Sequence, residues 1–173
     1  METIPREVKT PPRPDGWDEH VKKATAEAIL PKVLRWLKDN GCDHVDDEDE
    51  AAEVLEDLIA IADEEDGYHA CKALEREHWD CDRELVDILD GLPHLLYKAE
   101  KAAVEAWVTA YGVTVPFAVG DRVRVVKGYR HKGEEGEVKG LYPGTAQVSV
   151  VLASVSNGFP VFAVERIERV EVE

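Results

Sequence analysis

The chain has 173 residues, 44% hydrophobic and 34% charged, a balance typical of a globular protein and not of a disordered or fibrous chain. Its 37 acidic residues outnumber 21 lysines and arginines, and the formal net charge of −16 argues against direct DNA binding because like charges repel. No apolar run is long enough to span a membrane, the N-terminus has no signal-like apolar stretch, and three cysteines are too few for a disulfide framework. We therefore expect a cytoplasmic protein without membrane contact.

The N-terminal region combines a proline-rich start with a long amphipathic pattern. Four prolines and no hydrophobic period predict a flexible tail over residues 1–15. Over residues 17–40, apolar side chains recur at three- and four-residue steps, which predicts a helix that Asn40 and Gly41 terminate. Pro31 is expected to kink this helix.

Four further helices are expected before residue 113. The second should begin among the carboxylates of residues 46–50, because negative charge opposes the positive end of a helix dipole. Shorter helices are predicted over residues 68–79 and 82–90, and a last helix runs from Pro93 in its first turn to Gly112. Together they predict an acidic bundle of about five helices over residues 16–112.

The acidic surplus lies entirely in this bundle. Residues 1–116 hold 29 acidic and 13 basic residues, whereas residues 117–173 hold eight of each. Residues 46–66 contain twelve carboxylates and no lysine or arginine, which indicates either a solvated face that keeps the protein soluble or a surface that imitates the phosphates of a nucleic acid. The expected partner-binding face consists of Asp46, Asp47, Glu48, Asp49, Glu50, Glu53, Glu56 and Asp57.

In composition, the chain resembles small acidic inhibitors carried by phages, anti-CRISPR proteins among them. The resemblance implies a non-enzymatic phage or mobile-element protein that acts as a nucleic-acid mimic. Its expected partner is a protein with a basic nucleic-acid-binding surface, because such surfaces bind mainly through charge. This hypothesis needs no cofactor and no catalytic residue, and it leaves the oligomeric state open.

An enzymatic alternative rests on carboxylates at helical spacing. Asp49, Glu50 and Glu53, followed by Glu84 and Asp87, resemble the paired acidic motifs of the MazG-like nucleotide pyrophosphatases. That resemblance implies magnesium held by Glu50, Glu53, Glu84 and Asp87 against a triphosphate, since a hard cation prefers oxygen ligands.

Cysteine and histidine, the usual ligands of zinc, lie close together at three places in the chain. Three pairs, Cys42 with His44, His69 with Cys71, and His78 with Cys81, have the right residue types but not the spacing of a zinc finger. Buried free cysteines and surface histidines explain them more simply, so no metal site is expected.

The C-terminal third has the pattern of short antiparallel strands. Val123 and Val125 alternate with arginines, which predicts a half-buried strand. Gly128, Gly133 and Gly136 are expected to supply positive φ angles for the turn into a second strand that begins at Glu137. Further strands are predicted over residues 145–152, 159–164 and 169–172. An apolar link over residues 113–116 suggests that the two domains dock.

This segment resembles the KOW motif of small SH3-like barrels. The matching residues are Gly120, Asp121, Val123, Val125, Gly128, Lys132, Gly133, Gly136 and Val138. The resemblance implies an α+β protein in which the helical bundle is followed by a five-stranded SH3-like β-barrel over residues 117–173. KOW barrels contact RNA, ribosomes or RNA polymerase, so a second hypothesis makes the barrel the binding end. Its RNA-binding loop would comprise Lys127, Tyr129, Arg130, His131 and Lys132.

Overall fold

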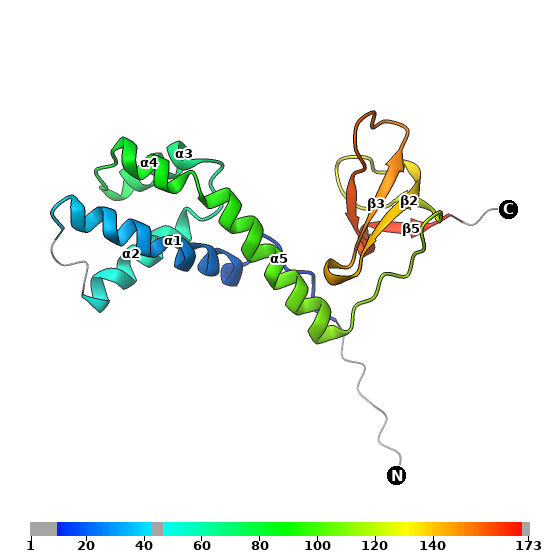
Figure 1. Ribbon diagram of the computed structural model, residues 1–173, viewed down its shortest axis with the longest axis horizontal. Coiled ribbons are helices and arrows are strands. Elements are labelled where there is room, and N and C mark those ends of the chain that lie inside the picture. Colours follow the sequence, from blue (N-terminus) through cyan, green and yellow to red (C-terminus); the bar gives the residue numbers. More distant parts are fainter. Residues whose placement is uncertain (1–9, 43–46, 171–173) are drawn as a thin grey trace, which may run out of the picture. The chain divides into compact units, whose positions relative to one another are not determined.

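The computed structural model describes residues 10–42 and 47–170 (Figure 1). Helices occupy the N-terminal part and antiparallel strands the C-terminal part, as the sequence predicts for an α+β protein. The chain divides into a helical unit over residues 12–104 and a strand unit that holds the remainder. Within the described ranges, no helix combines the length and the apolar character that crossing a membrane requires.

The helical unit contains the elements expected from the hydrophobic periodicity. The α-helices are α1 (Glu19–Asp39), α2 (Glu48–Ala60), α3 (Gly67–Leu74), α4 (Arg83–Leu89) and α5 (Leu92–Tyr111). A 3₁₀ turn, η1 (Glu75–Glu77), continues α3. The predicted end of α1 is confirmed, because Asn40 caps it and Gly41 has a φ of 88° that a glycine adopts at little cost. Pro31 lies inside α1, which continues through it.

Three aspartates of the acidic surplus cap helices. Asp47 accepts a hydrogen bond from the Asp49 amide at 3.1 Å at the start of α2. Asp66 and Asp82 do the same for α3 and α4, each at 2.8 Å. Each cap satisfies an amide that has no partner inside the helix, so part of the negative charge is structural.

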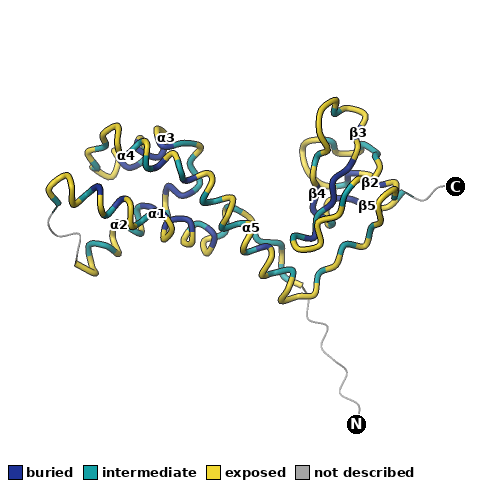
Figure 2. The backbone as a smooth tube through the Cα atoms, viewed as in Figure 1, coloured by how far each residue is buried: buried dark blue, intermediate teal, exposed yellow. Residues whose placement is uncertain are grey.

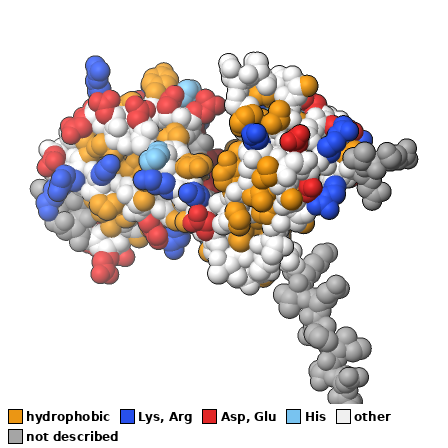
Figure 3. Space-filling model, turned by 45° about the vertical axis from the view of Figure 1, so that its right-hand side comes forward, with side chains coloured by type: hydrophobic (Ala, Val, Ile, Leu, Met, Phe, Trp, Pro, Cys, Tyr) orange, Lys and Arg blue, Asp and Glu red, His pale blue; other side chains and the backbone are white. Residues whose placement is uncertain are grey.

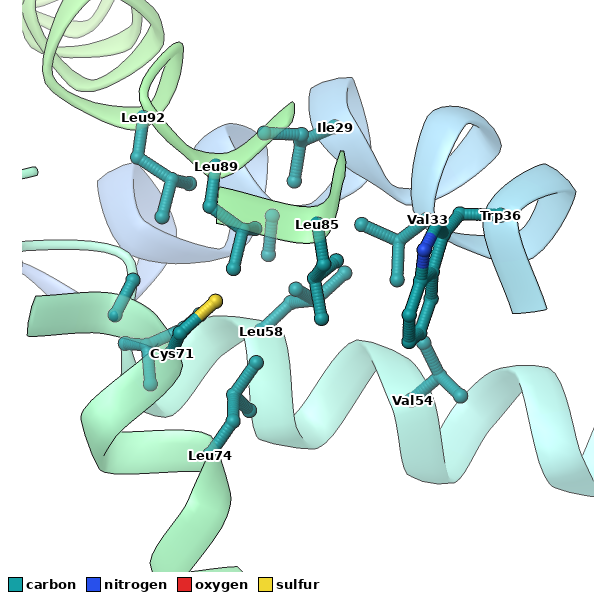
Figure 4. Close-up of a cluster of buried hydrophobic side chains, with 13 residues drawn as sticks. Ile29, Val33, Trp36, Val54, Leu58, Cys71, Leu74, Leu85, Leu89 and Leu92 are labelled. Carbon is teal, nitrogen blue, oxygen red and sulfur yellow. The ribbon is translucent and has the colours of Figure 1, made fainter. Parts of the chain in front are cut away.

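The core of the helical unit forms between α1, α2, α3 and α4. Figure 4 shows Ile29 and Val33 of α1 facing Leu58 of α2, with Leu85 of α4 between them. These side chains are at most 1% exposed, and burying each stabilises the fold by about 1.5–3 kcal/mol.

The expectation of five helices in one bundle was wrong in its last member. Helix α5 forms, but only its beginning joins the core, through the buried Leu92 and the half-buried Leu95. The packed helical core within the described residues is therefore built by four helices and the start of α5. Farther along α5, the Trp107 indole donates to the Pro11 carbonyl oxygen at 3.1 Å, which holds the described end of the proline-rich segment.

The strand unit contains one five-stranded antiparallel sheet in the order β4-β3-β2-β1-β5. Its strands are β1 (Arg122–Val125), β2 (Glu135–Tyr142), β3 (Gln147–Leu152), β4 (Val161–Ala163) and β5 (Ile167–Arg169). The 3₁₀ turns η2 (Pro143–Thr145) and η3 (Val164–Arg166) precede β3 and β5. The closing strand thus lies earlier than expected, because Ile167 pairs with Val125.

The inner face of the sheet is apolar, as the alternation in β1 predicts. Val123 and Val125 are at most 1% exposed and pack with Val138, Val148 and Val150 in one core. Figure 2 shows buried positions within the labelled strands of this unit, and in β3 the consecutive residues Val148, Ser149 and Val150 are all buried, so strict alternation is a feature of β1. Strands β4 and β5 are the two edges of the sheet, so its closure into a barrel is not shown.

Gly136 does not have the role that the sequence suggested. Gly128 and Gly133 have the expected positive φ angles of 117° and 87°, but Gly136 lies inside β2, opposite Val123 of β1 and Leu152 of β3. A Cβ atom there would lie 2.2 Å from the Val151 carbonyl oxygen. The glycine is therefore required by close packing within the sheet.

Candidate binding groove

The predicted acidic face lies on α2. Asp47, Glu48, Asp49, Glu53 and Glu56 are exposed, whereas Glu50 and Asp57 are half-buried; Asp46 lies outside the described residues. Glu48 and Glu56 are eight residues apart and share one side of the helix. Asp47 and Asp57 have structural partners, so they are less free to meet another molecule than their neighbours on α2.

Beside this face lies a groove with a volume of about 540 Å³. Three segments form its walls: the C-terminal end of α1 with the residues after it, residues 50–57 of α2, and residues 77–82, in which Trp79 lies 22 positions beyond Asp57 of α2. Apolar wall is supplied by Trp36, Leu37, Val54 and Trp79. The polar lining consists of Asn40, Cys42, Glu50, Glu53, Asp57, Glu77, His78, Asp80 and Asp82.

The two indoles of the groove are tied to two of its carboxylates. The Trp36 Nε1 atom donates to Asp82 Oδ1 at 3.1 Å, and the Trp79 Nε1 atom donates to Asp57 Oδ2 at 2.8 Å. Asp82 also caps α4, so its carboxylate is fixed from two directions. These bonds fix both the aromatic wall and the carboxylates beside it, which is the preorganisation that a binding site requires.

The groove is strongly negative. Six carboxylates line it, and no lysine or arginine is among the described residues that do so. Within the described ranges, Glu50, Glu53, Glu77 and Asp80 form no ion pair. Such a site attracts cations and repels nucleic acid. The adjacent His78 has a left-handed φ of 70° where η1 ends, a backbone conformation that is uncommon for a residue with a side chain.

The four carboxylates of the magnesium alternative do not converge. Glu50 and Glu53 line the groove, whereas Glu84 lines a second cavity of about 360 Å³ with Lys32 and Arg35. Asp87 is exposed on α4. No group of three or more His, Cys, Asp or Glu residues in the described part of the chain is placed to hold a metal ion.

The cysteines are free thiols. Cys71 lies in the helical core, and burial raises the pKa of its thiol to about 12. The Cys81 thiol donates to the Cys71 carbonyl oxygen at 3.6 Å, while Cys42 lines the groove. His44, the neighbour of Cys42 in one of the Cys/His pairs, lies outside the described residues.

The basic loop of the strand unit is exposed except for its histidine. Lys127, Tyr129, Arg130 and Lys132 are exposed. His131, expected to be a fifth contact residue, turns inward: its Nδ1 atom lies 3.0 Å from Glu134 Oε1, and its ring meets Phe162 edge-on. Ser154 lies 3.3 Å from the same Nδ1 atom and donates to Glu134 Oε2 at 2.5 Å. The histidine therefore holds the loop and does not extend from it.

This arrangement makes the loop sensitive to acid. The Ser154 hydroxyl, followed by His131, lowers the pKa of Glu134 below its usual 4.5. A lowered carboxyl pKa stabilises the fold above pH 4.5, and this stabilisation is lost as the pH falls through the folded-state value. We expect Ser154→Ala to raise the pKa of Glu134 towards 4.5 in a carboxyl-carbon NMR titration, whereas Ser156→Ala leaves it unchanged. An unchanged Glu134 pKa in Ser154→Ala would contradict the assignment.

Hydrophobic side chains also gather on one face of the strand unit (Figure 3). Val151 of β3 and Val161 of β4 are 41% and 48% exposed, and Tyr142 and Phe159 are exposed to a similar degree. Three aromatic residues of this unit differ in burial: Tyr142 and Phe159 are exposed, whereas Phe162 is buried. Only Phe162 belongs to the core.

Residues 77–82 are the part of the groove that the sequence did not reveal. The acidic helix was visible from its composition, but the pairing of Trp36 with Asp82 spans 46 positions and cannot be read from local spacing. A tryptophan among carboxylates in the segment HWDCD was the available signal. No family model matches the chain, and no curated protein shows significant sequence similarity to it. Any inference about the function of this protein therefore depends on its acidic face and its groove.

Proposed function

We propose that this protein is a non-enzymatic binding protein that docks on a basic surface of nucleic-acid machinery and competes there with nucleic acid. The observation that carries the proposal is the acidic face of α2 beside a groove lined by six carboxylates and no described lysine or arginine. A rigid helix can present several unpaired carboxylates to a basic surface. These carboxylates would then pair with the lysines and arginines that otherwise bind the phosphates of a nucleic acid. A phage or mobile-element inhibitor, of the anti-CRISPR type among others, would use such a face.

We further propose that the strand unit is an SH3-like barrel. Its support is the strand order, in which β5 returns beside β1, and the 3₁₀ turn η3 between β4 and β5. The exposed Lys127, Arg130 and Lys132 favour a second candidate function, in which this unit contacts RNA, a ribosome or RNA polymerase.

Competition for a labelled nucleic acid tests the first function. Purified nucleic-acid-binding proteins, including a guide-loaded CRISPR effector and core RNA polymerase, are loaded with fluorescent nucleic acid, and its release is followed by polarisation. We expect the intact chain to displace nucleic acid from at least one of them, and more weakly as salt rises. The double substitution Glu48→Gln and Glu56→Gln should raise the concentration needed by about tenfold, since two attractive charges are lost.

The matched control removes two charges elsewhere. Glu84→Gln with Asp87→Asn neutralises two exposed carboxylates of α4 and should leave competition unchanged. If no protein releases its nucleic acid at about 50 mM salt, where electrostatic binding is strong, the proposed function is wrong. If competition survives Glu48→Gln with Glu56→Gln but is lost on charge reversal of Lys127, Arg130 and Lys132, the basic loop is the binding end.

A further inference from the structure

The groove has two kinds of surface in one place. Its apolar lining consists of the half-buried Leu37 and Trp79 with the buried Trp36 and Val54 beside them, and its charged lining consists of carboxylates from α2 and residues 77–82. Its volume of about 540 Å³ lies within the range of roughly 300–1,000 Å³ typical of ligand pockets. The groove therefore has room for a large side chain together with some flanking backbone.

The carboxylates of this charged lining are held in place. Asp57 and Asp82 each give one oxygen to an indole N–H, so the second oxygen of each remains an acceptor for a bound group. Glu53, Glu77 and Asp80 form no ion pair within the described ranges and add further acceptors. Acceptors thus approach the groove from α2 on one side and from residues 77–82 on the other.

The ligand that satisfies both surfaces is a cation with an apolar stem. A bare metal ion does not fit, because no three ligands converge among the described residues. An arginine side chain fits better than lysine: its planar guanidinium presents five N–H donors to several carboxylates at once and stacks on aromatic rings, whereas an ammonium is a compact and strongly hydrated charge. Its aliphatic stem can pack on the half-buried Leu37 and Trp79.

We propose that the groove receives one arginine side chain of the basic partner. This inference rests on the proposed function and adds that docking is anchored by a single residue, with the acidic face of α2 supplying long-range attraction. A few anchor residues that fill pockets supply most of the binding energy at an interface, whereas exposed charges mainly govern the association rate.

Peptides of equal charge distinguish specific binding of arginine in the groove from non-specific electrostatic attraction to the acidic protein. The acetylated and amidated heptapeptides KKGRGKK and KKGKGKK carry the same formal charge and differ only at the centre. Binding to the full chain is measured by isothermal titration calorimetry, with quenching of tryptophan fluorescence as a second readout because Trp36 and Trp79 line the groove. We expect the arginine peptide to bind at least about tenfold more tightly than the lysine peptide, as a bidentate pairing would require.

Two matched variants locate this preference. Glu77→Gln with Asp80→Asn alters the groove but not the α2 face, and should reduce the preference to less than about twofold. Glu84→Gln with Asp87→Asn should keep it. Equal affinity for the two peptides, or a preference that survives Glu77→Gln with Asp80→Asn, overturns the inference. The nucleic-acid competition assay uses whole partners and the α2 variant, so its outcome is independent of the peptide measurements. If the chain displaces nucleic acid but binds the two peptides equally, the arginine pocket is wrong and the proposed acidic docking is right.

Discussion

Replacing Gly67 with alanine is expected to destabilise the helical unit by roughly 3 kcal/mol or more, the upper range for overpacking a closely packed site. Gly67 begins α3 and is buried where this helix meets α4. A Cβ atom there would lie 2.1 Å from the Val86 carbonyl oxygen and 2.7 Å from the Asp90 amide nitrogen. Both are backbone atoms, so no side-chain rotation relieves the overlap and the helices must separate.

The same substitution should also disturb the wall of the groove that residues 77–82 form. The Gly67 amide donates to Asp90 Oδ1 at 2.7 Å, which ties α3 to the end of α4, and residues 77–82 lie between these helices. Urea unfolding followed by tryptophan fluorescence measures the loss, because Trp36 and Trp79 lie in this unit. Gly91→Ala is the control: its Cβ would lie 3.4 Å from the nearest atom, and the unfolding midpoint should stay close to that of the parent chain. A Gly67→Ala chain as stable as Gly91→Ala would contradict the packing described for α3 and α4.

Gly136→Ala is expected to disrupt the sheet to a similar extent, by roughly 3 kcal/mol. Gly136 lies in β2, which pairs with β1 on one side and β3 on the other. Its Cβ would lie 2.2 Å from the Val151 carbonyl oxygen and 2.7 Å from a methyl group of Val150. The overlap with the carbonyl oxygen is decisive, because β2 can relieve it only by moving away from β3 and losing ladder hydrogen bonds.

Amide hydrogen exchange reports this loss within the strand unit. In Gly136→Ala we expect the protection of β2 and β3 amides to fall by about a hundredfold or more, which is the factor that about 3 kcal/mol implies. Gly144→Ala serves as the matched control, since nothing lies within 4 Å of its Cβ position. Unchanged protection of the Val150 and Val151 amides in Gly136→Ala would show that the β2–β3 contact is looser than described.

Much of the local structure follows from the sequence because its causes are local. Helix starts at Asp47 and Asp82 depend on a side chain that reaches an amide two or three residues later. The end of α1 at Asp39 is favoured by the positive φ angle of Gly41 just beyond its cap, and the strand of Val123 and Val125 depends on alternation alone. The concentration of charge on α2 is likewise a property of composition and helical spacing.

Other features depend on which segments meet in space. Gly136 resembles a turn glycine in sequence, yet the approach of β3 is what forbids a side chain there. His131 reads as part of a basic loop, but Glu134 and Ser154 hold it inward.

The groove shows the same division most clearly. The sequence by itself determined that α2 is acidic and helical, because charge and periodicity are encoded residue by residue. Only the tertiary structure decided that Trp36 meets Asp82 and Trp79 meets Asp57, across 46 and 22 positions. Packing of the helices around one apolar core sets those distances, and no local pattern specifies which polar groups that packing leaves side by side at the surface.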